Sequence, residues 1–354
     1  MAKSRRIFIV AICTLITVLS ISYIAYTNKD RANKITRMDF PVVGGHIPSD
    51  VDYEVVDNVS FDDERLKGTG KLSYLVYKLK SDRIEKSKIS DLKRIFKLEQ
   101  AEETDMGEVL TYANSDGTLE IYENGTFAFN VKNRNSDKPV NLSDSKCKEI
   151  ASNFLSSNNL LPNDFYENGI SHETRTAVYN SNDSLVVRKH VYFNRKVNDK
   201  KVYGVSRIIV SLGVDGIIES INYLNRDIES LIGDKISIKS YDEALADLKL
   251  NKGTVRMNED TKKVKINNVN IVYWEDSSPT SKQSHIQPVY HFKGDAINSD
   301  GKKDTFEAFI PAIPENMTQV IKTNYKPIPG DKKPVDSNSN KDFSNQPKKD
   351  TKLK

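Results

Sequence analysis

Cysteine is scarce in this chain, which has two cysteines and one tryptophan among 354 residues. Cys13 lies in an uncharged apolar run and Cys147 in a predicted helix, so one folded domain cannot contain a disulfide framework. We therefore expect Cys147 to be a small buried residue. A near absence of cysteine also suits many bacterial surface proteins.

Sequence patterns typical of enzymes are missing as well. The chain has no HExxH, CxxC or GxSxG motif, no glycine-rich phosphate loop and no EF-hand loop. Ser206 and Ser211 fall in a predicted strand, where ordinary sheet positions are the default interpretation. The pair Glu102-Glu103 lies in a polar segment and is interpreted as solvated charge. We expect no enzymatic activity and no catalytic, cofactor-binding or metal-binding residue.

Histidine is also rare. The five histidines are His46, His172, His190, His285 and His291. His285 and His291 are six residues apart in a predicted extended segment, where one sheet face could hold both, with Glu307 or Asp304 on a neighbouring strand. This spacing raises a metal site as an alternative, but we favour two half-exposed strand histidines.

Positive charge is concentrated at the two ends of the chain. Residues 1–40 have a net charge of +5, residues 331–354 have +3, and residues 41–330 have −4. A mildly acidic central part argues against a general nucleic-acid-binding surface. The basic ends suit contact with a membrane or an anionic wall polymer.

Residues 7–26 form the one long apolar run, with 20 uncharged residues after a basic head. That length predicts a transmembrane helix. A cleavable signal peptide fits less well because Tyr23-Ile24-Ala25 is a poor exit site, and a lipoprotein signal needs a small residue where Ile12 precedes Cys13. We expect a single-pass anchor in the cell membrane, with the N-terminus cytoplasmic and the C-terminal domain extracytoplasmic.

Hydrophobic periodicity predicts three helices, around 85–98, near 144–157 and after Ser240. Alternating apolar residues predict strands at 72–79, 109–113, 119–122, 127–131, 174–179, 185–193, 201–212, 217–223, 264–273, 288–292 and 305–313. Asp116-Gly117, Asn124-Gly125, Asn198-Asp199 and Asp215-Gly216 mark hairpin turns. Tyr203 and Ile209, six residues apart on one predicted strand, are expected to face the same interior.

Helix followed by antiparallel strands occurs three times, so the predicted fold class is α+β: a single N-terminal transmembrane helix, then antiparallel-sheet modules each with a packed helix. The expected organisation is a cytoplasmic head (1–6), a transmembrane helix (7–26), a stalk and extended segment (27–70), a first module (71–135), an α+β region of two helix-plus-meander units (140–325) and a disordered basic tail (326–354). One aromatic residue of each pair, Tyr192-Phe193 and Tyr273-Trp274, is a candidate for exposure because neighbours on a strand face opposite sides.

The segment from Val191 to Ser220, VYFNRKVNDKKVYGVSRIIVSLGVDGIIES, resembles the hairpin of PepSY-like domains. Farther on, ISIKSYDEALADL, VNIVYW, QPVYHFKGDA and FEAFIPAI resemble the closing half of the YycI/YycH type. Proteins of that type are membrane-anchored extracytoplasmic regulators of a sensor kinase in low-GC Gram-positive bacteria. The similar topology spans about residues 70–313, and its motifs are turns and core residues.

The resemblance implies a non-catalytic, membrane-anchored extracytoplasmic protein that binds envelope or membrane proteins. A sensor histidine kinase of a two-component system is the implied partner, contacted through the transmembrane helix and the extracytoplasmic domain. The alternative is a PepSY-like modulator or inhibitor of an extracellular peptidase. An envelope enzyme of unrecognised type is a third hypothesis. No cofactor and no active-site residue follow from the resemblance.

Overall fold

The computed structural model describes residues 35–38, 51–68, 71–80, 84–133, 138–176, 184–232, 235–276 and 284–319, which belong to one compact unit. The expected head (1–6), membrane segment (7–26) and tail (326–354) lie outside the described residues, as does His46. No helix in the described ranges combines the length and the apolar composition needed to cross a bilayer.

Three α-helices are described, α2 (Lys86–Ile95), α3 (Asp144–Ser157) and α4 (Tyr241–Lys249). They confirm the helices predicted from periodicity. Helix α4 begins with a capping box, in which Ser240 accepts from the Glu243 amide and the Glu243 carboxylate accepts from the Ser240 amide. Helix α3 begins after Ser143, which accepts from the Lys146 amide. Short 3-10 helices are η1 (Glu64–Lys67), η2 (Val214–Gly216) and η3 (Glu315–Met317).

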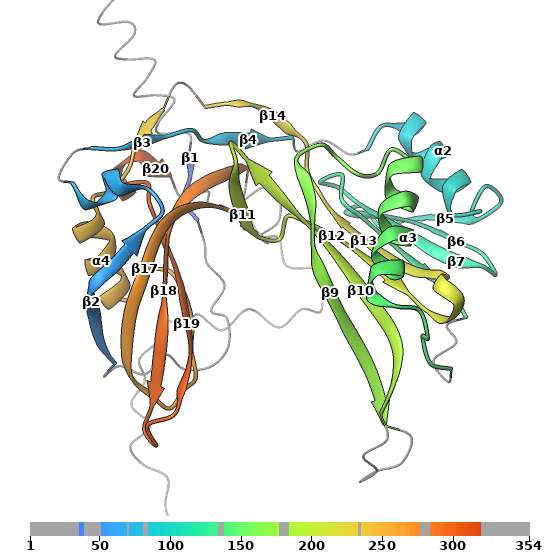
Figure 1. Cartoon of the computed structure of the whole chain (residues 1–354). Coiled ribbons are helices and arrows are strands. Elements are labelled where there is room, and N and C mark those ends of the chain that lie inside the picture. Colours follow the sequence, from blue (N-terminus) through green and yellow to red (C-terminus); the bar gives the residue numbers. More distant parts are fainter. Residues whose placement is uncertain are drawn as a thin grey trace, which may run out of the picture. The chain divides into compact units, whose positions relative to one another are not determined.

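Strands dominate the described part of the chain (Figure 1). The first ten are β1 (Ile35–Thr36), β2 (Asp52–Phe61), β3 (Ser73–Tyr74), β4 (Tyr77–Leu79), β5 (Glu102–Asp105), β6 (Val109–Ala113), β7 (Gly117–Tyr122), β8 (Phe127–Val131), β9 (Phe165–Thr176) and β10 (Ser184–Val197). The others are β11 (Lys200–Gly204), β12 (Arg207–Leu212), β13 (Ile218–Leu224), β14 (Ile228–Leu231), β15 (Ile236–Ser237), β16 (Thr254–Arg256), β17 (Thr261–Glu275), β18 (His285–Asn298), β19 (Lys303–Pro311) and β20 (Thr318–Gln319).

Sixteen of these strands form one mixed sheet, whose main path runs β14-β4-β18-β17-β11-β10-β12-β13-β8-β7-β6-β5. Most neighbours are antiparallel, but β11 and β2 each pair with β17 in parallel. The pairs β1-β20 and β3-β15 form separate two-stranded sheets. Residues Asp52–Phe61, expected in an extended segment, thus supply a strand to the large sheet.

The predicted α+β class, with separate antiparallel modules each carrying a packed helix, is wrong. The described part is mostly β, with twenty strands, three α-helices and a mixed sheet that continues across the expected modules. The pairings β11-β17 and β4-β18 make that continuity. Both join residues far apart in the sequence, so local periodicity had no means of revealing them.

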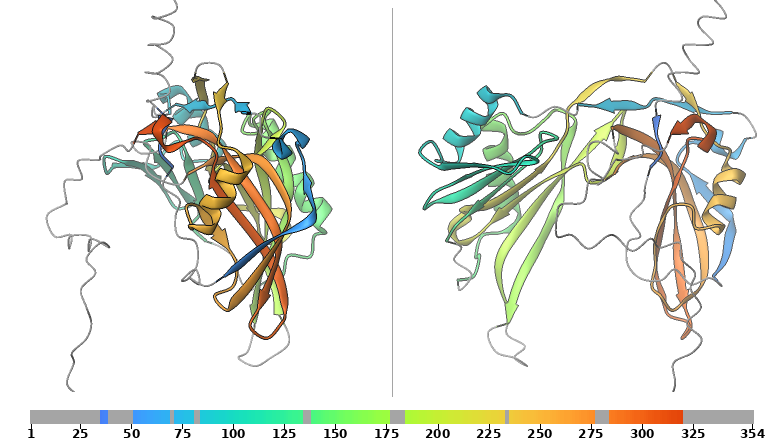
Figure 2. Two further views of the ribbon diagram at one scale, coloured as in Figure 1. Left: turned by 90° about the vertical axis from the view of Figure 1, so that its left-hand side faces the viewer. Right: turned by 180° about the vertical axis from the view of Figure 1, so that it is seen from behind.

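Two large hydrophobic clusters lie on this sheet. In the first, Cys147, Ala151 and Leu155 of α3 pack on residues of β6–β8, β10, β12 and β13, which confirms the predicted burial of Cys147. In the second, Ala244 and Leu248 of α4 pack on β17–β19, and Figure 2 shows α4 against the face of these strands. Each helix buries its apolar stripe on the sheet, which is the main source of stability for such short helices.

The strand predicted at 201–212 is divided into β11 and β12, and Gly204 is the reason. Its φ is +92°, and a Cβ at this position would lie 1.8 Å from the Glu275 carbonyl oxygen. The chain therefore leaves β11 here and begins β12 at Arg207. Tyr203 packs with Phe309, whereas Ile209 is half-buried between the core residues of β12, so the prediction that they share one interior is wrong.

A buried network of charges lies where β10, β17 and the segment before β14 meet. Arg226 Nε lies 2.8 Å from Glu275 Oε1, and both side chains are 3% exposed or less. Arg195 Nη1 lies 3.9 Å from Glu275 Oε2, and its Nε donates to Asp164 Oδ2 over 2.6 Å. Arg195 Nη1 also donates to the Arg226 carbonyl over 2.8 Å. Paired in this way, charges tolerate burial that would otherwise be costly.

Candidate functional site

The structure brings His291 and Glu307 together but not His285. His291 Nε2 lies 2.7 Å from Glu307 Oε1, while six residues along β18 place His285 roughly 20 Å away. Asp304 instead accepts from Asn258 Nδ2 over 2.6 Å. Both strand histidines are buried, so their expected half-exposure is wrong. Within the described ranges, no group of three or more His, Cys, Asp or Glu side chains is placed to hold a metal ion.

The His291–Glu307 pair is enclosed by aromatic rings. His291 stacks on Phe309 at a centroid distance of 4.4 Å, and Tyr203 meets it edge-on at 5.0 Å. Burial lowers the pKa of His291. For Glu307, burial raises the pKa, but the hydrogen bond to His291 and the neighbouring positive charges lower it by more, so the pKa falls overall. Because His291 has no exposed surface, this pair suits structural support of the sheet rather than contact with a substrate.

His190 lies in a row of polar contacts that crosses three strands. His190 Nδ1 lies 2.8 Å from Ser211 Oγ, and His190 Nε2 lies 3.4 Å from Glu173 Oε2. A serine, a histidine and a carboxylate in sequence form the pattern of a nucleophilic triad. However, Ser211 is only 2% exposed, and Glu173 is also bound to Arg188. The hydroxyl therefore has no open path to a substrate, and the row acts as a cross-strand hydrogen-bond network.

The two aromatic pairs behave differently. Phe193 is buried while Tyr192 is half-buried, with its hydroxyl 2.9 Å from Ser171 Oγ, as the alternation predicts. Tyr273 and Trp274 are both buried, so the expectation of one exposed member is wrong there. Both faces of β17 are covered at this point, because Tyr273 packs with one cluster and Trp274 with another.

A hollow with an apolar lining lies between α2, α3 and the sheet, and we call it the apolar groove. Its volume is about 330 Å³. Its apolar residues are Ile95, Phe96, Phe129, Val131, Phe154 and Ile218. Four of these, one each from α2, β8, α3 and β13, are only half-buried although they pack on the first core. The groove therefore presents apolar surface to solvent.

Local sequence accounts for the floor and wall of the apolar groove. Helix α2 ends at Ile95, and Lys97 then adopts a φ of +58°. This turn brings the Phe96 ring onto Phe129, stacked at 4.2 Å with planes 12° apart. Phe154 of α3 forms the opposite wall, with its ring centroid 6.3 Å from that of Phe96. Three rings from distant parts of the chain thus make one aromatic floor and wall.

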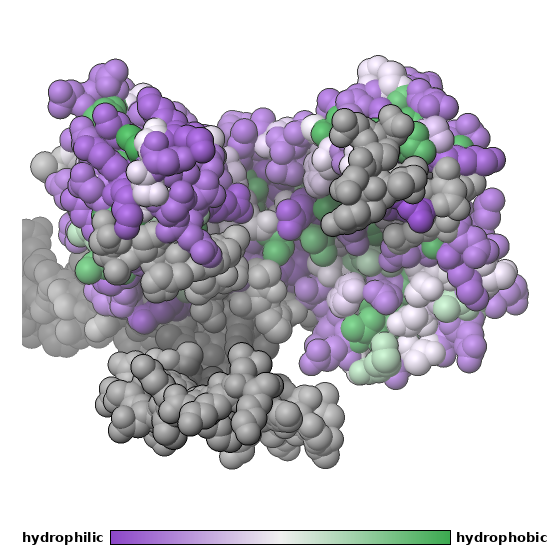
Figure 3. Space-filling view, turned by 90° about the horizontal axis from the view of Figure 1, so that it is seen from below, coloured by the Kyte–Doolittle hydropathy of each residue, from purple (hydrophilic) through white to green (hydrophobic). Residues whose placement is uncertain are grey.

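The rim of the apolar groove carries one charge of each sign, from the exposed residues Lys97 and Asp116. Apolar floors with polar rims are typical of protein-binding surfaces. On the face shown in Figure 3, the described residues are mainly hydrophilic and hydrophobic ones form small groups. The described residues on that face therefore present small apolar groups rather than one broad apolar patch.

Sequence reasoning placed the groove residues on helices and strands but not in a site. Ile95, Phe96 and Phe154 belong to apolar helical stripes, which normally fill a core. Periodicity identifies the stripe, but it does not show which members remain half-exposed at its end.

Comparisons with known proteins identify a distant structural similarity. No protein-family model matches the chain, and no curated protein matches it. Among solved structures, it is similar to the Bacillus megaterium YpeB C-terminal domain, with 13% identity and a TM-score of 0.32 over 64% of this chain and 99% of that chain. A likeness of this size supports no conclusion about fold or function, so the site is interpreted from its own residues.

Proposed function

We propose that this chain is a non-catalytic protein of the bacterial cell envelope that binds another envelope protein. In this proposal residues 7–26 insert into the cell membrane, the N-terminus is cytoplasmic, and the domain that follows is extracytoplasmic. The partner is a sensor histidine kinase of a two-component system, whose activity the chain regulates.

The apolar groove is the observation that carries this proposal. Its half-exposed Ile95, Phe154 and Ile218 surround a hollow of about 330 Å³, large enough for one or two apolar side chains of a partner. Burying such side chains gains free energy in proportion to the apolar area removed from water. The charged rim also fixes the orientation of a bound partner, because Lys97 attracts its acidic groups and Asp116 its basic groups.

The choice of a sensor kinase rests on the sequence. The segment from Val191 to Ser220 resembles PepSY-like domains, and later segments resemble the YycI/YycH type of kinase regulator. The antiparallel pairing of β10, β12 and β13 within and beside the first of these segments fits that resemblance. The uncharged run 7–26 supplies an anchor beside a membrane-bound kinase.

Crosslinking in intact cells, followed by purification of the full chain from membranes, tests the proposal. The wild-type chain should carry a crosslinked sensor histidine kinase, and Ile218→Glu should lose it because a carboxylate in the apolar groove disfavours burial. Ile217→Glu is the matched control, since Ile217 is 62% exposed and does not line the groove.

Three outcomes separate the possibilities. Loss of the kinase with Ile218→Glu and retention with Ile217→Glu, at equal melting temperatures, supports the proposal. A secreted peptidase recovered in place of the kinase supports the alternative function, modulation of a peptidase. Equal crosslinking by both variants would mean that the apolar groove is not the contact surface.

A further inference from the structure

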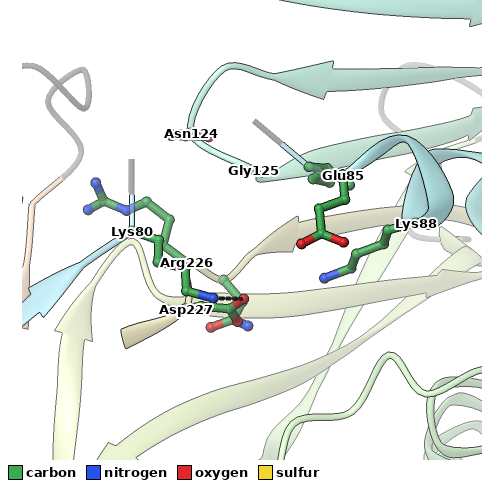
Figure 4. A pocket seen from close by; sticks show the side chains of 9 residues that line it. Lys80, Glu85, Lys88, Asn124, Gly125, Arg226 and Asp227 are labelled. Carbon is green, nitrogen blue, oxygen red and sulfur yellow. Dashed lines mark ion pairs between the residues drawn. The ribbon is translucent and has the colours of Figure 1, made fainter. Parts of the chain in front are cut away.

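A second cavity, separate from the apolar groove, lies at the other end of α2. Its volume is about 430 Å³ (Figure 4). Residues from four distant segments line it: Lys80 after β4, Glu85 and Lys88 at the start of α2, the turn Asn124-Gly125, and the stretch 225–227 before β14. Because α2 has ten residues, the cavity and the groove are roughly 15 Å apart along the helix.

Both signs of charge face this cavity. Figure 4 shows Glu85 and Lys88 entering from the start of α2, with Lys80 and Asp227 on the other side. Lys80 Nζ lies 3.8 Å from Asp227 Oδ2, which is a loose and half-exposed ion pair. Such a pair is readily opened by a ligand that offers better contacts. A ligand with only one sign of charge would meet repulsion from one residue on each side.

The start of α2 adds positive potential without a competing cap. Glu85 occupies the N-cap position, but its side chain makes no capping hydrogen bond. The first hydrogen bond of the helix runs from the Ile89 amide to the Glu85 carbonyl, so the amides of the first turn have no partner within the helix. These amides and the helix dipole attract an anionic group.

Asn225 supplies an independent sign that a ligand belongs here. It lines the cavity and is only 7% exposed, with Nδ2 donating to the Tyr223 hydroxyl over 3.3 Å. Among the described residues, none donates to its buried Oδ1. Buried amide oxygens in proteins are almost always satisfied, so this atom requires a donor, which an ordered water or a ligand would supply.

We propose that this cavity binds a small zwitterion, an amino acid or a short peptide with free termini. Its carboxylate would lie at Lys88 and the first turn of α2, with Lys80 nearby. Its ammonium group would donate to Asp227 and Glu85. It would also donate to Asn225 Oδ1 once the amide group turns towards the cavity, because that oxygen is buried in this structure. The cavity volume is in the range of small-molecule pockets and leaves room for a side chain.

Calorimetric titration of the full chain in detergent micelles tests this inference and needs no partner protein. The probes are the twenty common amino acids and L-alanyl-L-alanine, with N-acetyl-alanyl-alanine and alanyl-alanine amide as blocked forms of the dipeptide. At least one zwitterion should bind saturably, and blocking either of its termini should weaken binding at least tenfold. Equal binding of blocked forms, or saturable binding by none of the zwitterions, overturns the proposal.

Three variants locate the binding. Lys88→Gln should weaken it at least fivefold, whereas Lys86→Gln should not, because Lys86 is an exposed residue of the same helical turn that does not line the cavity. Asn225→Leu should weaken binding at least tenfold while leaving the melting temperature equal or higher, since it removes the unpartnered oxygen. If Lys88→Gln and Asn225→Leu bind as wild type does, the zwitterion lies elsewhere and the inference is wrong.

Discussion

Replacing Glu275 by glutamine should strongly destabilise the protein. Glu275 is 1% exposed, and its carboxylate lies 2.8 Å from Arg226 Nε and 3.9 Å from Arg195 Nη1. Glutamine keeps nearly the same shape but removes the charge, so two buried guanidinium groups lose their shared counter-charge. Breaking a buried pair in this way costs about 3–5 kcal/mol.

Urea unfolding of the full chain measures this loss through the fluorescence of Trp274. It is the one tryptophan of the chain, lies next to Glu275 and is 3% exposed, so unfolding should change its emission. The midpoint should fall while the slope stays constant, which reports a change in stability rather than in exposed surface. Arg94→Gln is the control, because the Arg94–Asp91 pair is largely exposed and contributes little.

A double-mutant cycle identifies the cause. Arg226→Met alone should also be costly. Glu275→Gln combined with Arg226→Met should cost less than the sum of the two single changes, because the second change removes the charge that the first deprived of its Glu275 counter-charge. A loss below about 1 kcal/mol for Glu275→Gln would refute the reasoning, since a buried ion-pair network does not tolerate the loss of its central charge.

Two further predictions concern pH and backbone conformation. Burial lowers the pKa of His285 from 6.5 to about 4, so as the pH falls the unfolded chain binds a proton before the folded chain does. The neutral form of His285 should therefore contribute its full stabilisation above pH 6.5. The free energy of unfolding should fall by about 3 kcal/mol as the pH decreases towards 4. Unfolding at several pH values should show this loss, and His285→Gln should flatten it; an unchanged profile contradicts the assigned cause. Gly204→Ala should cost at least about 2 kcal/mol of stability, through positive φ and the clash with the Glu275 carbonyl. Gly107→Ala, at φ +84° with open space around it, measures the backbone part alone, and equal losses would exclude the clash.

Part of the candidate sites could be read from the sequence. Lys88, Ile95 and Phe96 lie on a helix predicted from apolar spacing, and the Asn124-Gly125 turn was predicted as a hairpin. Their assembly was not predictable, because the groove and the cavity each combine residues more than 100 positions apart. The buried acceptor of Asn225 carries no sequence signal, since an asparagine after a strand normally indicates a turn.

Turns and helix starts in this protein follow from preferences of neighbouring residues. Asn198 and Asp199 both adopt positive φ in a two-residue hairpin, and Ser240 with Glu243 starts α4, because these preferences act within a few residues. Tertiary structure decided the rest. The parallel pairing of β11 with β17 ends a predicted strand at Gly204 and buries Glu275 beside two arginines. Strands pair through backbone hydrogen bonds, and segments of many different sequences can form such bonds. Which distant strands pair is therefore decided only when the whole chain folds.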